Sequence, residues 1–138
     1  MRRRLLFSLS FATAFLSVFA LYADEAALPL GDVEKGAQVF RKCVACHQVG
    51  AQAKNRVGPV LNGIFGAKAG IVDGFKYSKA MKRASADGLI WDYEHLDAYV
   101  ENPKALVSGT RMRFRVIKDA QYRRDVLAYL REFADDPF

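Results

Sequence analysis

The chain has 138 residues, of which 51% are hydrophobic and 26% are charged, and its formal net charge is +6. This length suits one ordinary domain and is too short for two domains of typical size. The sequence shows no internal repeat and no low-complexity tract, and its basic residues alternate with acidic ones, so we predict no nucleic-acid partner.

The first 23 residues have the order of features that is typical of a secretory signal peptide. A cluster of three arginines precedes an apolar run at 5–22, and the small residues Ala20 and Ala23 come before acidic residues. We therefore predict a signal peptide at 1–23 and a mature, periplasmic domain at 24–138. Cleavage after Ala20 and cleavage after Ala23 both fit the pattern.

An uncleaved membrane anchor is the competing interpretation of the same segment. The apolar run at 5–22 is 18 residues long, which is at the short edge of what spans a hydrocarbon layer of about 30 Å. Its serines and threonine, and the small residues at its end, favour cleavage. Three of the 21 basic residues and none of the 15 acidic residues fall within 1–23, so the remaining domain carries about +3.

The first predicted helix follows Asp32, whose side chain suits a helix N-cap. Apolar or small residues then recur at helical spacing through Phe40 to Cys43. Among them is Gly36, where the last helix of the chain could cross closely. This helix therefore leads directly into the motif Cys43-Val44-Ala45-Cys46-His47.

The chain has two cysteines, Cys43 and Cys46, and His47 follows directly. A structural disulfide would not explain why a histidine follows the second cysteine. A thioredoxin-like redox pair needs a strand before the motif. A zinc site needs four ligands, and beyond these three residues only His95 is a usual one. C-x-x-C-H is instead the signature of c-type haem attachment. Two thiols at this spacing can reach two vinyl groups of one porphyrin edge, and the next side chain can bind the iron. We therefore predict one haem c, bound covalently through Cys43 and Cys46.

The rest of the chain predicts three further helices and two loops. In chain order these are a loop at 48–74, a short helix at 78–84, a helix from near Asp92 that ends before Pro103, a loop at 105–116 and a last helix from near Asp119. Long connections of this kind are usually functional. The predicted fold class is all-α, with about four helices and two loops that enclose one covalently bound haem.

Short motifs recur along the chain between Gly31 and Arg131. They include Gly31-Asp32-Val33-Glu34-Lys35-Gly36, Cys43-Val44-Ala45-Cys46-His47, Val57-Gly58-Pro59, Gly74-Phe75-Lys76-Tyr77-Ser78, Asn102-Pro103-Lys104 and Gly109-Thr110-Arg111-Met112. Together they resemble the class I cytochrome c family, especially its short, mitochondrial-like bacterial members. The resemblance covers nearly all of the predicted mature chain, and it implies the cytochrome c fold.

The resemblance also implies roles for individual residues. His47 and Met112 would bind the iron, a ligand pair that raises the reduction potential. The Pro59 carbonyl would accept a hydrogen bond from His47 and orient its ring. Tyr77 and Trp91 would donate hydrogen bonds to a haem propionate. Tyr99 would approach the methionine sulfur or the haem face, and Phe114 would cover the haem near the methionine side.

Met81 and His95 are the rival ligands. Met81 lies on a short amphipathic segment and is expected to pack or to lie at the surface, whereas His95 is expected to face solvent. Between His47 and Met112 we expect a slot for the haem. The residues expected to line this slot are Leu61, Phe65, Trp91, Leu96, Tyr99 and Phe114.

Two protein ligands would leave the iron no position for a substrate, so we predict an electron carrier and not an enzyme. The carrier would be a soluble, monomeric, periplasmic protein that transfers single electrons between larger redox proteins. Their acidic docking faces would be attracted by Lys42, Lys68, Lys104, Arg111, Arg113 and Arg115. The alternatives are a membrane-anchored relay that retains residues 5–22, a haem subunit of a dehydrogenase or oxidase, and an enzyme or gas-binding protein with five-coordinate iron.

Overall fold

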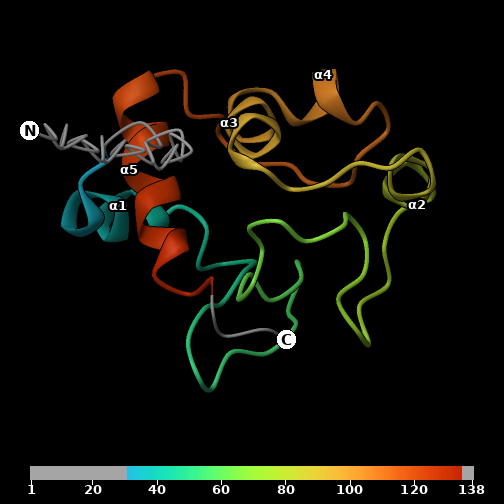
Figure 1. The fold of residues 1–138 in the computed structure, drawn as a ribbon, viewed down its shortest axis with the longest axis horizontal. Helices are drawn as coiled ribbons and strands as arrows, with labels where there is room; N and C mark the ends of the chain where they lie inside the picture. Colours follow the sequence, from blue (N-terminus) through green and yellow to red (C-terminus); the bar gives the residue numbers. More distant parts are fainter. Residues whose placement is uncertain (1–30, 135–138) are drawn as a thin grey trace, which may run out of the picture.

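The computed structural model describes residues 31–134, which form five α-helices (Figure 1). The helices are α1 (Val33–Phe40), α2 (Lys79–Ala86), α3 (Tyr93–Glu101), α4 (Pro103–Leu106) and α5 (Ala120–Arg131). Within 31–134 the only β-type pairing is an isolated bridge between Lys68 and Ile90. The all-α prediction is therefore confirmed. The predicted signal peptide at 1–23 lies outside the described residues, and none of the helices that are described is long and apolar enough to cross a membrane.

Four helices begin at a residue whose side-chain oxygen caps the first turn. The N-caps are Asp32, Ser78, Asp92 and Asp119, and each accepts a hydrogen bond from a backbone amide two or three residues further on. Such a cap satisfies an amide that has no partner within the helix, and it stabilises a helix by about 1 kcal/mol. The starts of these four helices therefore agree with the sequence prediction.

The sequence predicts a loop at 105–116, but α4 occupies its first residues. Asn102 ends α3 with φ −154° and ψ 85°, and Pro103 is the first residue of α4. Proline suits the first position of a helix, because its fixed φ is helical and its missing amide would have no partner there. Pro103 therefore ends one helix and also starts the next.

The crossing of α1 and α5 depends on Gly36. A Cβ atom at Gly36 would lie 2.0 Å from the carbonyl oxygen of Asp125 and 2.8 Å from the Cβ of Tyr129. The Asp125 side chain is fully buried and accepts a hydrogen bond of 2.9 Å from the backbone amide of Asp32. Figure 1 shows the two helices side by side at one end of the molecule. This packing fixes the end of α1, and with it the position of the cysteine motif.

The remaining helices complete a core on which the loops converge. α3 packs against both α4 and α5, and α2 lies at the opposite end of the molecule from α1 (Figure 1). The long connection between α1 and α2 runs along one side of these helices. The core includes Trp91 and Leu96, which are both about 6% exposed. Every helix except α4 contributes a side chain to one large cavity in this core.

Candidate cofactor site

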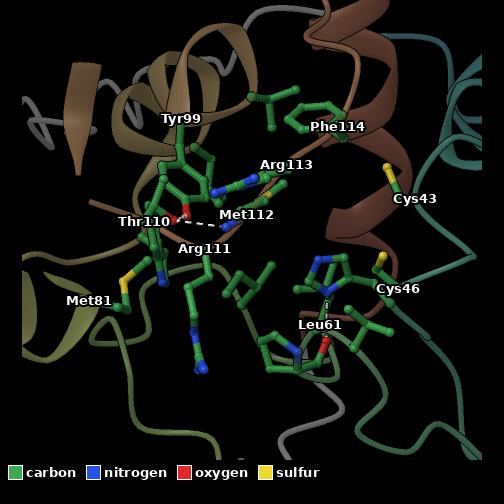
Figure 2. A pocket seen from close by; sticks show the side chains of 18 of the residues that line it. Cys43, Cys46, Leu61, Met81, Tyr99, Thr110, Arg111, Met112, Arg113 and Phe114 are labelled. Atoms are coloured by element: carbon green, nitrogen blue, oxygen red, sulfur yellow. Dashed lines mark hydrogen bonds between the residues drawn. The ribbon is translucent and has the colours of Figure 1, made fainter. Parts of the chain in front are cut away.

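The cavity has a volume of about 330 Å³ and is lined mainly by apolar and aromatic side chains. That volume lies in the usual range of small-molecule sites. Cys43 and Cys46 lie on one side of it, and Tyr99, Thr110 and Met81 lie on the other (Figure 2). All nine residues to which the sequence analysis assigns a cofactor contact line this cavity: Cys43, Cys46, His47, Pro59, Tyr77, Trp91, Tyr99, Met112 and Phe114.

The cysteine motif continues from α1 as a series of turns. The Cys43 amide donates to the Phe40 carbonyl at 2.7 Å, and the amides of Cys46 and His47 both donate to the Cys43 carbonyl at 2.9 Å. These bonds direct both thiols and the imidazole toward the cavity, which all three line. The local backbone therefore presents the whole motif to one site.

The two thiols are not joined in a disulfide. Burial raises the pKa of the Cys43 thiol to about 11, although nearby Lys42 partly opposes this shift. A thiol with such a pKa is protonated at neutral pH, which is unfavourable both for zinc binding and for thiol–disulfide exchange. Within 31–134 no group of three or more metal-ligating His, Cys, Asp or Glu side chains occurs. Neither observation favours a zinc centre in the described part of the chain.

The His47 ring is held in one orientation. Its Nδ1 donates to the Pro59 carbonyl at 2.7 Å, because a carbonyl oxygen can only accept. The lone pair of Nε2 is therefore available to a metal. Burial lowers the pKa of His47 and outweighs the opposing effect of the Pro59 bond, so the imidazole is neutral at neutral pH. A neutral imidazole whose other nitrogen is hydrogen-bonded is the usual form of a histidine ligand.

Gly58 leaves space for this imidazole. A Cβ atom at position 58 would lie 2.3 Å from Cε1 and 2.6 Å from Nε2 of His47. Any side chain at position 58 would therefore displace the ring. Gly58 lies directly before Pro59, so one turn both receives the His47 ring and fixes its hydrogen bond.

Met112 lies on the segment between α4 and α5, and Thr110 orders the backbone beside it. The Thr110 hydroxyl accepts a hydrogen bond of 3.2 Å from the Met112 amide and is 2.6 Å from the hydroxyl of Tyr99 on α3 (Figure 2). Burial raises the pKa of Tyr99, although its bond to Thr110 opposes the shift. The tyrosine is therefore a neutral donor or acceptor that connects the Met112 segment to α3.

Aromatic rings form much of the rest of the cavity wall. The Trp91 and Tyr99 rings are 4.9 Å apart between centroids, and Phe75 meets Tyr77 edge to face at 4.8 Å. Phe75 lines the cavity but is not among the residues predicted to contact the cofactor. The sequence feature that could have predicted this contact is the spacing of two residues between Phe75 and Tyr77, because that spacing places both side chains on one face of an extended chain. Such rings suit a large, flat, apolar ligand.

The structure differs from the expected slot at one position, Phe65, whereas Met81 packs, which is one of its two predicted alternatives. Phe65 does not line the cavity; its ring instead lies 5.9 Å from the Arg131 guanidinium. Met81 does line the cavity and is 7% exposed, so it packs and does not lie at the surface. His95 has a side chain 42% exposed and pairs with Asp92, as a solvent-facing residue would.

The donor set fits a c-type haem. Two thiols lie at one side of an apolar cavity, and a neutral imidazole and a thioether open into the same space. Imidazole and thioether are the ligands of iron in cytochromes c, and neither brings a charge into the apolar site. His47 and Met112 would therefore hold the iron, and Cys43 and Cys46 would hold the porphyrin edge.

Comparisons with a family model, with related sequences and with solved structures all match the same protein family. The family model "Cytochrome c" matches residues 33–134. The chain is 52% identical to a cytochrome c2 of Rhodomicrobium vannielii over 111 residues, which covers 80% of this chain and 86% of the relative. It is 43% identical to a cytochrome c2 of Blastochloris viridis over 119 residues, covering 86% and 91%. The solved structure of cytochrome c2 from Rhodospirillum centenum matches with a TM-score of 0.72 and 42% identity, covering 75% of this chain and 99% of that one.

Proposed function

The chain belongs to the class I cytochrome c family and transfers electrons through a covalently bound haem c, and we propose that it does so as a soluble, periplasmic carrier between larger redox proteins. Haem c supplies an iron that gains and loses one electron. The observation that carries the proposal is that His47, with Nε2 available, and Met112 both line the cavity. With both residues bound to the iron, a substrate would find no open position, so the protein would be no enzyme.

The remaining residues of the site would keep the haem dry and oriented. Tyr77 and Trp91 would donate hydrogen bonds to a propionate, and Phe114 would cover the methionine side. Burial raises the pKa of Tyr77, which keeps its hydroxyl protonated and able to donate. An apolar wall limits how far water reorganises when the iron changes its charge.

The absorption spectrum tests this proposal. We expect the oxidised holoprotein at neutral pH to show the weak far-red charge-transfer band of methionine sulfur bound to ferric iron. We also expect the reduced protein not to bind carbon monoxide, because the sixth position is taken. A spectrum without the band, together with rapid binding of carbon monoxide, would favour an enzyme or a gas-binding protein.

The cavity opening supports docking of an acidic partner. Lys42, Arg111 and Arg113 line the cavity, and no aspartate or glutamate of the described chain does so. The ion pairs within 31–134 instead involve α1, α3 and α5. A basic rim of this kind attracts an acidic surface and speeds encounter.

Arg113 offers the sharpest test of docking. It makes no ion pair with the described residues, whereas Arg111 also donates a hydrogen bond to the Lys76 carbonyl. We expect Arg113→Glu to slow electron transfer to an acidic redox partner by roughly several-fold at low salt, with the difference shrinking above about 0.1 M, where the Debye length falls below about 10 Å. Stopped-flow kinetics over a salt series measures this effect.

Arg124→Glu is the matched control for docking. It makes the same change of charge on α5, where Arg124 bonds to Gln121 and does not line the cavity. If both variants slow the reaction equally at every salt concentration, net charge alone is responsible and the docking face lies elsewhere.

The cellular location rests on the N-terminal segment. We propose that residues 1–23 are a signal peptide that is removed on export, with a retained anchor at 5–22 as the alternative. The intact mass of the mature holoprotein distinguishes these forms and also separates cleavage after Ala20 from cleavage after Ala23. Copurification with a dehydrogenase or oxidase at high salt would favour a dedicated haem subunit over a free monomer.

A further inference from the structure

The segment that carries Met112 has little regular structure of its own. It runs from the end of α4 to the start of α5 at Ala120. Among the described residues, its backbone groups at 111–116 make no hydrogen bond to another backbone group. At its start the segment is held by the contact of Thr110 with Tyr99. Something must also hold its far end if the Met112 sulfur is to keep its place in the cavity.

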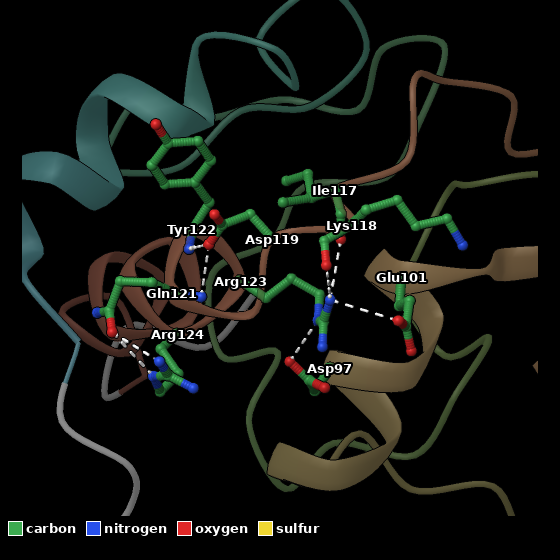
Figure 3. Close-up of polar contacts among 9 residues, drawn as sticks. All are labelled: Asp97, Glu101, Ile117, Lys118, Asp119, Gln121, Tyr122, Arg123 and Arg124. Atoms are coloured by element: carbon green, nitrogen blue, oxygen red, sulfur yellow. Dashed lines mark hydrogen bonds and ion pairs between the residues drawn. The ribbon is translucent and has the colours of Figure 1, made fainter.

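Arg123 on α5 holds that far end (Figure 3), in addition to the 3.4 Å hydrogen bond that the Ile117 amide donates to the Val100 carbonyl on α3. Its Nη1 donates to the carbonyl oxygens of Ile117 at 3.1 Å and Lys118 at 2.8 Å. The same side chain is only 9% exposed, and its Nε donates to the Asp97 carboxylate at 2.8 Å. Glu101 lies 3.5 Å from Nη1. One guanidinium therefore joins the segment, α3 and α5.

The chemistry of this contact requires arginine. A guanidinium has five donors in a rigid fork and stays charged at every relevant pH. Both carbonyls and the carboxylate can therefore be bound at once, while the Asp97 partner offsets the cost of burying the charge. A lysine ammonium could not reproduce this fixed fork. Among the described residues, the side chain of the neighbouring Arg124 bonds only to Gln121, within α5, so it makes no such connection.

We propose that Arg123 is a positioning residue for the Met112 ligand, holding the Ile117–Lys118 end of its segment against α3 and α5. The proposal rests on the proposed function, in which Met112 binds the iron. α3 also carries Tyr99, which holds the Thr110 end. The segment is thus fixed to one helix near both of its ends, and the thioether lies between them. Loss of the Arg123 contact would let the Met112 side of the site open more often.

Competition by imidazole measures this opening in the ferric holoprotein. Imidazole can reach the iron only when Met112 has left it, so its apparent affinity is its intrinsic affinity multiplied by the open fraction. Hydrogen bonds to a charged group stabilise strongly, so Arg123→Gln should raise the apparent affinity by roughly ten- to a hundred-fold. The apparent affinity for imidazole is measured from the loss of the far-red sulfur band as imidazole is titrated into the ferric holoprotein.

Three matched variants accompany Arg123→Gln. Arg124→Gln removes a neighbouring guanidinium on α5 and should leave the affinity unchanged. Leu127→Ala removes a core side chain of α5 that is 1% exposed and does not line the cavity. It should lower the free energy of unfolding without raising imidazole affinity. Arg123→Lys keeps the charge and should give an intermediate increase; if Arg123→Gln cannot be isolated folded, this variant decides alone.

Two results would overturn the proposal. One is an unchanged imidazole affinity in the Arg123 variants. The other is an equal increase in Leu127→Ala at a matched loss of unfolding free energy, because general destabilisation would then explain the effect. Failure of the proposed function is distinguishable, since the unmodified holoprotein would then lack the sulfur band before any imidazole is added.

Discussion

Replacing Met112 by alanine is expected to lower the reduction potential of the holoprotein by roughly a few hundred millivolts, since axial ligands set haem potentials over a range of about 0.8 V. The physical reason is that a soft thioether sulfur favours ferrous iron over ferric iron. Without it the sixth position would take water or another hard ligand, which favours the ferric state. Protein-film voltammetry on the purified holoprotein measures the shift.

Met81 supplies the matched control, because it is the other methionine that lines the cavity. Its side chain is 7% exposed on α2, and Met81→Leu conserves most of its volume. We expect Met81→Leu to keep the far-red band and to change the potential only slightly, whereas Met112→Ala loses the band. The reverse pattern would identify Met81 as the ligand, and loss of the band in neither variant would exclude both.

The features that the sequence predicts well are those that depend on local chemistry. A carboxylate or hydroxyl before an apolar repeat sets a helix start, which is why the caps at Asp32 and Asp119 could be read directly. The spacing of Cys43, Cys46 and His47 likewise acts over a few residues of chain. The nine residues assigned to the cofactor, most of them through the resemblance to the class I cytochrome c family, all line one cavity.

The features that escape prediction depend on tertiary partners. Arg123 and Arg124 are adjacent residues of the same type, so the sequence does not distinguish their roles. Arg123 is buried between α3 and the Met112 segment, whereas Arg124 bonds within its own helix. Phe65 is predicted to line the slot, but its ring lies near the Arg131 guanidinium, and no sequence pattern predicts this contact. Which face an aromatic ring presents is decided by packing against distant elements, so the composition of the cavity wall could be only partly predicted.

Replacing Gly36 by alanine is expected to destabilise the fold strongly, although the same change in an exposed helix interior would stabilise it by about 0.5–1 kcal/mol. The new methyl group would lie 2.0 Å from the Asp125 carbonyl oxygen, which is backbone and cannot rotate away. α1 and α5 would have to separate, and this would break the contact between the Phe40 and Tyr129 rings, whose centroids are 5.3 Å apart. We expect a loss of about 3 kcal/mol or more in the free energy of unfolding.

Urea unfolding, followed by the fluorescence of Trp91, measures the effect of Gly36→Ala, and Gln38→Ala is its control. Gln38 lies exposed on the same helix, so that substitution tests helix propensity without touching α5. Because α1 ends at Phe40 and leads into Cys43 through a hydrogen bond of 2.7 Å, a displaced α1 would also move the first attachment thiol. The yield of covalent holoprotein should therefore fall in Gly36→Ala and not in Gln38→Ala. A Gly36→Ala protein that is as stable as the parent would mean that the helices do not cross as closely as described.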